Sequence, residues 1–170
     1  MNRLLPAVVP RTLPPRAYVV PAASTIAGSA LAALPLVAAA PMLPPFGLLM
    51  ALGWRLLRSE LWGAWVALPL GLADDLLTGA PLGTGMVLWT TCFLVFDVMD
   101  NRLIWRDHWQ DWLIASAALA FCLAGSWLFL RIDGGGGSIL LLLPQYLVGV
   151  CCIPLAVRIC ATLDRWRLRR

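Results

Sequence analysis

The sequence has few charged residues and no lysine. Of its 170 residues, 13% are charged and 61% are hydrophobic, whereas soluble domains have roughly 25% charged and about 45–50% apolar residues. This shortage of charge excludes an ordinary soluble domain and indicates an integral membrane protein. The net charge of +4 comes from arginines, but they cluster in short segments between apolar runs. Their pattern therefore indicates membrane topology and argues against a nucleic-acid partner.

Histidine is equally scarce. His108 is the only one in the sequence, which excludes a metal centre built from several histidines and a proton relay between two of them. No serine lies in a nucleophile-elbow pattern, and the four glycines at 134–137 do not form a phosphate-binding P-loop motif. The sequence therefore predicts a non-enzymatic protein with no catalytic residue, no metal and no cofactor.

Paired-cysteine motifs are missing as well. The five cysteines lie within or at the ends of apolar runs, and none has the C-x-x-C spacing of a metal site. We expect them to act as small hydrophobic side chains in helices, not as a disulfide framework. They are Cys92, Cys122, Cys151, Cys152 and Cys160.

Long apolar segments are abundant. Six of them predict an all-α integral membrane protein with six transmembrane helices. They form a membrane domain of residues 17–160, preceded by a basic, proline-rich leader (1–16) and followed by a basic tail (161–170). The expected spans are about 18–40, 42–57, 61–77, 85–99, 113–130 and 139–160.

The first apolar run has two interpretations. It ends in "VAAAP", which is similar to a signal-peptidase site, so a cleaved signal sequence is one possibility. However, the run is longer than the 7–15-residue core of a signal sequence, and Pro41 would follow the cleaved bond. These two features favour an uncleaved first span.

The arginines also predict the orientation. If six spans leave both termini in the cytoplasm, every arginine except Arg131 lies on the cytoplasmic side. Arg55 and Arg58 close the second span, where we expect their side chains to reach the membrane interface. The same topology places the turn after the third span on the outer, non-cytoplasmic side.

That turn follows two adjacent carboxylates in the stretch "GLADDLLTGAPLG" (71–83). Neighbouring residues on a helix point in different directions, so Asp74 and Asp75 cannot form a paired acid–base device on one face. We expect one of them to face headgroup water. The other should turn inward and accept hydrogen bonds from N–H groups of the following turn. Gly79 and Gly83 should stop the helix and reverse the chain.

Two more carboxylates, Asp97 and Asp100, lie on one helical face at the inner end of the fourth span. They could bind a cation or pair with Arg102 or Arg158. We favour interfacial positions or structural ion pairs over a cation site.

The segment "NRLIWRDHWQDW" (101–112) is rich in tryptophan. Trp105, Trp109 and Trp112 share one helical face with His108. This spacing predicts a short interfacial helix whose tryptophans anchor it in the membrane surface.

The stretch "GLADDLLTGAPLGTGMVLW" resembles the signature of the MreD family, the rod shape-determining membrane proteins of bacteria. The family pattern is G-x-x-x-D-L-x-x-G-x-x-x-G, and Asp74 stands where the family usually has a hydrophobic residue. The likeness in length and span pattern covers most of the chain, but only residues 71–83 are specific. The matching residues are Gly71, Asp75, Leu76, Gly79 and Gly83.

The resemblance implies a scaffold of the bacterial cell-elongation complex in the inner membrane. Its implied partners in peptidoglycan synthesis are an MreC-like single-span protein, an MreB-like actin homologue, a RodA-type glycosyltransferase and a penicillin-binding transpeptidase, in contact with membrane lipid. The family is also similar in helix arrangement to substrate-binding subunits of vitamin transporters. A small-molecule-binding transport subunit is therefore the alternative, although few polar residues could line its site: Asp74, Asp75, Thr90, Thr91, Gln145 and Tyr146.

Overall fold

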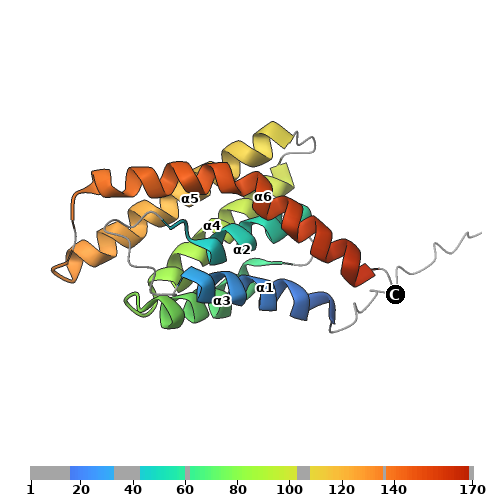
Figure 1. Cartoon of the computed structure of the whole chain (residues 1–170), viewed down its shortest axis with the longest axis horizontal. Helices are drawn as coiled ribbons and strands as arrows, with labels where there is room; N and C mark the ends of the chain where they lie inside the picture. Colours follow the sequence, from blue (N-terminus) through green and yellow to red (C-terminus); the bar gives the residue numbers. More distant parts are fainter. Residues whose placement is uncertain (1–15, 33–42, 60–61, 103–107, 136, 169–170) are drawn as a thin grey trace, which may run out of the picture.

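The protein is seen in a computed structural model that describes residues 16–32, 43–59, 62–102, 108–135 and 137–168. Within these ranges the chain forms six α-helices and one short 3-10 helix, with no strand, which confirms the all-α prediction for this part (Figure 1). The helices are α1 (Arg16–Ala32), α2 (Phe46–Leu57), α3 (Ala64–Thr78), α4 (Thr84–Arg102), α5 (His108–Ile132), η1 (Ile139–Leu141) and α6 (Leu142–Leu168).

The six α-helices coincide with the six apolar runs, but several ends differ from those expected. The leader up to residue 15, and the part of the first run beyond Ala32, lie outside the described residues. Helix α5 begins at His108, before the expected start at 113, and α6 continues to Leu168 through the basic tail. Helix α6 therefore extends beyond the expected end of the last span at 160, into the expected tail. The extra turns of α6 are stabilised because Asp164, which is buried there, forms ion pairs with Arg58 of α2 and with Arg167.

Helix α2 lies at the centre of the bundle. It packs against α1 on one side and α6 on the other, and α3 packs against both α4 and α1. In Figure 1, α5 and α6 run side by side along one edge of the molecule, and α1 and α3 lie at the opposite edge. Most of α2 is buried, including Trp54, which donates a hydrogen bond from its indole Nε1 to Ser24 Oγ (2.8 Å). This arrangement brings the C-terminal end of α2 level with the ends of α4 and α6.

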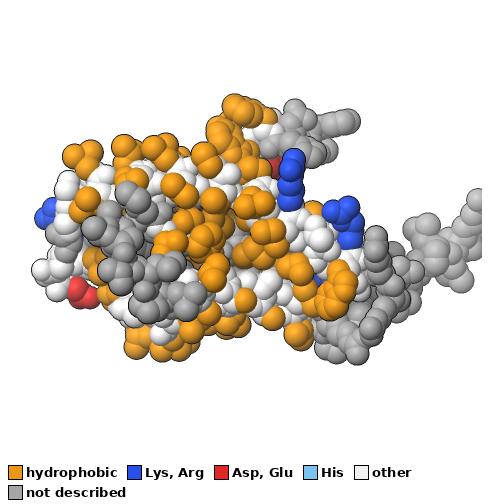
Figure 2. Space-filling view, viewed as in Figure 1, with side chains coloured by type: hydrophobic (Ala, Val, Ile, Leu, Met, Phe, Trp, Pro, Cys, Tyr) orange, Lys and Arg blue, Asp and Glu red, His pale blue; other side chains and the backbone are white. Residues whose placement is uncertain are grey.

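The outside of the bundle is strongly apolar. Two helical segments, Trp109–Ile132 and Ile139–Arg167, are long and apolar enough to cross a membrane, while Tyr18–Leu31 and Phe46–Leu57 are apolar but shorter. Figure 2 shows hydrophobic side chains spread across the middle of one face, with most of the visible charged side chains towards its two ends. Exposed apolar side chains also include Trp65 on α3 and Leu94 on α4. A molecule with this surface needs an apolar surrounding or a covering partner.

Candidate functional site

Asp75 binds the N-terminus of the next helix. Its side chain is only 2% exposed, and its two carboxylate oxygens accept hydrogen bonds from the N–H groups of Gly83 (2.9 Å) and Gly85 (2.8 Å). These N–H groups lie where α4 begins, at Thr84, and have no partner within the helix. The negative charge also suits the positive end of the helix dipole. The predicted inward carboxylate is therefore Asp75, and its hydrogen bonds to the turn are confirmed.

The glycines of the motif have two different roles. Gly79 (φ 70°) and Gly83 (φ 96°) adopt the left-handed backbone conformation that favours glycine, so the predicted reversal of the chain is confirmed. Gly71 instead lies where α3 touches α4. A Cβ atom at Gly71 would lie 2.6 Å from the carbonyl oxygen of Gly85, which is backbone and cannot move aside easily. The missing side chain therefore allows the close packing that brings Asp75 to its N–H donors.

Asp74 points elsewhere, as the helical spacing predicts. Its carboxylate forms a hydrogen bond with the Ser29 side chain of α1 and is partly buried. It also lies next to Gly47 of α2, where an added Cβ atom would approach Asp74 Oδ1 to 3.0 Å. The second carboxylate therefore faces Ser29 of α1 and Gly47 of α2, and does not point outwards as expected.

A small cavity of about 110 Å³ adjoins both carboxylates. Thr84 and Trp89 of α4 and Cys122 and Ser126 of α5 also line it. Both oxygens of Asp75 are already bound to N–H groups, so this cavity lies beside a carboxylate that joins α3 to the start of α4. Within the described part of the chain, no group of three or more His, Cys, Asp or Glu residues is placed to hold a metal ion.

The outward side of the turn is apolar. Leu76 is well exposed, and Leu82 is 71% exposed. Asp75 and Gly71 are buried, so they cannot form a partner contact directly. Of the motif residues singled out in the sequence, Leu76 and Gly79 alone are exposed. Leu82 was missed, although its place between Pro81 and Gly83 at the tip of the turn could have indicated it.

A second polar cluster joins α2 to α4 at the other end of the bundle. The Arg55 side chain is 2% exposed, and its Nη2 atom lies 2.5 Å from Asp97 Oδ1 and 2.8 Å from Asp100 Oδ2. Its Nη1 atom donates to the carbonyl oxygen of Ser59 (2.8 Å). The predicted structural ion pairs are confirmed, but the cation is Arg55. The Arg55 side chain does not extend outwards as expected, because it is buried and paired with Asp97 and Asp100 of α4.

Asp164 forms a third polar cluster that the sequence did not reveal. Its carboxylate lies 2.9 Å from Arg58 Nη2 on α2 and 2.7 Å from Arg167 Nη2 one turn further along α6. The i, i+3 spacing of Asp164 and Arg167 was the available signal. Arg55 and Arg58 thus connect the C-terminal end of α2 to α4 and to α6.

The tryptophan segment differs from its predicted form. The expected short interfacial helix over 101–112 is wrong, because residues 101 and 102 end α4 and His108 already begins α5. Trp109 is exposed, and the centre of its ring lies 5.1 Å from the centre of the Trp112 ring. Trp112 is half-buried and donates from Nε1 to the carbonyl oxygen of Val150 on α6 (3.4 Å), so it joins two helices. Trp105 lies outside the described residues.

Comparisons with known proteins identify no relative: no family model matches the chain, and neither does any curated protein or solved structure. The three polar clusters therefore have to be interpreted from their own geometry. The Asp75, Asp97, Asp100 and Asp164 carboxylates each bind a backbone N–H group or an arginine. Their common effect is to join one helix to another.

Proposed function

We propose that this chain is a non-enzymatic, multi-span protein of the bacterial inner membrane that scaffolds the cell-elongation complex. The observation that carries the proposal is the Asp75 carboxylate, because both of its oxygens are used to cap α4. This carboxylate lies in the one segment with a specific resemblance to the rod shape-determining proteins. A group bound in this way supports a rigid turn, whereas a catalytic carboxylate needs a proton or substrate within reach.

The membrane arrangement in this proposal has six spans with both termini in the cytoplasm. The two long apolar helices and the exposed apolar side chains support it. The placement of Arg55, Arg58 and Arg167 at the end of the bundle opposite the α3–α4 turn also supports it, because arginines are enriched on the cytoplasmic side. With 12 residues, α2 is about 18 Å long and therefore needs flanking segments or a thinned bilayer to cross a hydrocarbon core of about 30 Å.

The contact with a partner would form at the outer turn. Leu76 and Leu82 project from a segment held by the Asp75 hydrogen bonds, so they form a fixed apolar surface. An MreC-like single-span protein is the proposed partner at this surface. The MreB-like protein, the RodA-type glycosyltransferase and the transpeptidase would join through the same assembly.

The alternative of a small-molecule transport subunit has less support. Its ligand would have to reach the polar groups at Asp74 and Asp75, but the cavity beside them is about 110 Å³. Small-molecule sites in proteins usually occupy about 300–1,000 Å³. A vitamin-sized ligand would therefore need a rearrangement of α2, α3 and α5.

Capture of the partner from detergent-solubilised membranes tests this proposal. The full-length wild-type chain should retain the MreC-like protein, and Leu82→Ser should retain about tenfold less, since burial of a leucine contributes roughly 1.5–3 kcal/mol. Ile132→Ser is a matched control, because Ile132 is 73% exposed at the end of α5 while Leu82 is 71% exposed. Equal capture by wild type and both variants, or equal loss in both variants, would contradict a contact at this turn.

A further inference from the structure

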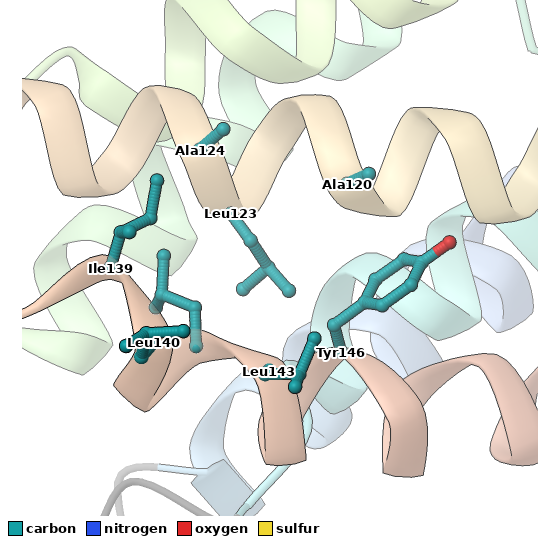
Figure 3. Close-up of a pocket in the computed structure, with 8 residues that line it drawn as sticks. Ala120, Leu123, Ala124, Ile139, Leu140, Leu143 and Tyr146 are labelled. Carbon is teal, nitrogen blue, oxygen red and sulfur yellow. The ribbon is translucent and has the colours of Figure 1, made fainter.

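An apolar groove runs between α5 and the start of α6. It has a volume of about 280 Å³ and is lined on α5 by Ala120, Leu123 and Ala124 (Figure 3). Ile139, Leu143 and Tyr146 line it on the other side. The two alanines leave room that larger side chains would fill. Ile139 and Leu143 are exposed, so the groove opens at the surface of the molecule.

The face of α5 that lines the groove continues towards a cation. Ala120, Ala124, Trp127 and Arg131 follow one another at steps of four, three and four residues, which places them along one side of the helix. Trp127 donates from Nε1 to the carbonyl oxygen of Gly137 (3.1 Å), two residues before Ile139. Trp127 therefore lies at the loop end of the groove.

Arg131 lies beyond this tryptophan. Its guanidinium carbon is 4.9 Å from the centre of the Trp127 ring, and its side chain is exposed. Arg131 lies seven positions beyond Ala124 in the helix, which is about 10 Å along the axis. An apolar groove, an indole and an arginine thus follow in the order of hydrocarbon, interface and headgroup in a lipid layer.

We propose that this groove binds one acyl chain of an anionic glycerophospholipid, whose phosphate lies against Arg131. The inference rests on the membrane location proposed above. An apolar helix is a poorer occupant, because it offers no negative charge to the exposed Arg131 that lies beside Trp127 at the loop end of the groove. A single hydrocarbon chain fits this shape, and the arginine distinguishes an anionic headgroup from a zwitterionic one.

Competitive native mass spectrometry tests the proposal on the full chain in detergent. The probes are dioleoylphosphatidylglycerol and dioleoylphosphatidylcholine at equal concentration. Wild type should retain the anionic lipid about fivefold more than the zwitterionic one, because phosphatidylcholine carries a choline cation beside its phosphate and phosphatidylglycerol does not. Arg131→Gln should bring the ratio close to one, and Arg131→Lys should keep most of the preference. Arg158→Gln changes an exposed arginine further along α6 and should leave the ratio unchanged.

The groove itself is tested with Ala124→Phe, which should reduce retention of both lipids severalfold at unchanged helix content by circular dichroism. The proposal is overturned if Arg131→Gln keeps the wild-type ratio, or if Ala124→Phe retains both lipids as wild type does. It is also overturned if Ala124→Phe leaves lipid binding intact and instead lowers capture of a protein partner.

Failure of the lipid proposal can be distinguished from failure of the membrane proposal. A chain that resists alkaline carbonate extraction but shows no lipid preference overturns only the lipid site. A chain that carbonate releases from membranes overturns both.

Discussion

At the scale of single residues, each buried charge in the described bundle binds a group on another element. Asp75 binds the N–H groups of Gly83 and Gly85, and Arg55 binds Asp97 and Asp100. A charge in an apolar environment is costly unless it is paired or hydrogen-bonded. These contacts therefore explain how charged side chains are accommodated beside apolar helices.

The Asp75 cap leads to a stability prediction. Asp75→Asn should lower the free energy of unfolding by about 1–3 kcal/mol. The amide keeps one accepting oxygen, but its NH₂ group cannot accept the hydrogen bond of the second buried N–H group. Thermal unfolding in detergent, followed by circular dichroism, measures this change. Asp133→Asn, in the exposed turn after α5, is the matched control and should be nearly neutral. Equal melting temperatures of the two variants would contradict the capping role.

The Arg55 cluster leads to a second prediction. Arg55→Met should destabilise the protein by about 3 kcal/mol, the lower end of the effect of breaking a buried ion pair. The lower end is expected because Asp97 and Asp100 stay 38% and 22% exposed and can be hydrated. Adding Asp97→Asn and Asp100→Asn to Arg55→Met should recover most of the loss. No recovery in the triple variant, measured by the same thermal unfolding, would show that Arg55 acts through packing alone.

The residue contacts were only partly predictable. That one of the two adjacent carboxylates turns inward follows from helical geometry and from the glycines that come after them. The pairing of Arg55 with Asp97 joins positions 42 residues apart, and a pattern within one segment cannot reveal it. An arginine at the end of an apolar segment is expected at the membrane interface. The burial of Arg55 depends on its pairing with carboxylates of another helix, which the local sequence does not show.

At the scale of helices, hydrophobic runs predicted which elements exist but not where each one ends. Helix α6 continues past the apolar run because Asp164 pairs with Arg58 of α2. Helix α5 begins early, and Trp112 in its first turns bonds to α6. Both extensions depend on contacts with a distant helix, so local sequence could not indicate them.

The close contact of α3 with α4 can be tested at this scale. Gly71→Ala should destabilise the protein by about 1–3 kcal/mol, because its Cβ atom would lie 2.6–2.7 Å from backbone atoms of Gly85 and Met86. Gly63→Ala is the matched control, since nothing lies within 4 Å of its added Cβ atom and its φ is −70°. If Gly71→Ala melts at the same temperature as Gly63→Ala, close contact of α3 with α4 at Gly71 is contradicted.

At the scale of the whole molecule, polar contacts lie at the two ends of an apolar bundle. The Asp75 turn occupies one end, and the Arg55 and Asp164 clusters occupy the other. The helices between them expose large apolar side chains. Composition alone predicted this apolar bundle, whereas its partners depend on surface shape and on other chains, which composition cannot specify.

The proposed orientation gives a prediction for the entire chain. Alkaline phosphatase, which is active only outside the cytoplasm, should be active when fused after Gly135 and inactive when fused after Arg170. The reason is that the proposed topology places the α5–α6 loop outside and the C-terminus inside. Activity at Arg170 with none at Gly135 would contradict this orientation, and equal cellular levels of the two fusions are the necessary control.

The proposed role of this protein is to hold the cell-elongation machinery in place. If the source is a rod-shaped bacterium, as the proposal requires, depletion of the protein there, with cell width measured by microscopy, tests this role most directly. Depleted cells should widen and become round, and wild-type protein should restore the rods, whereas Asp75→Leu should not. Depleted cells that keep their rod shape and width at normal growth would contradict the account.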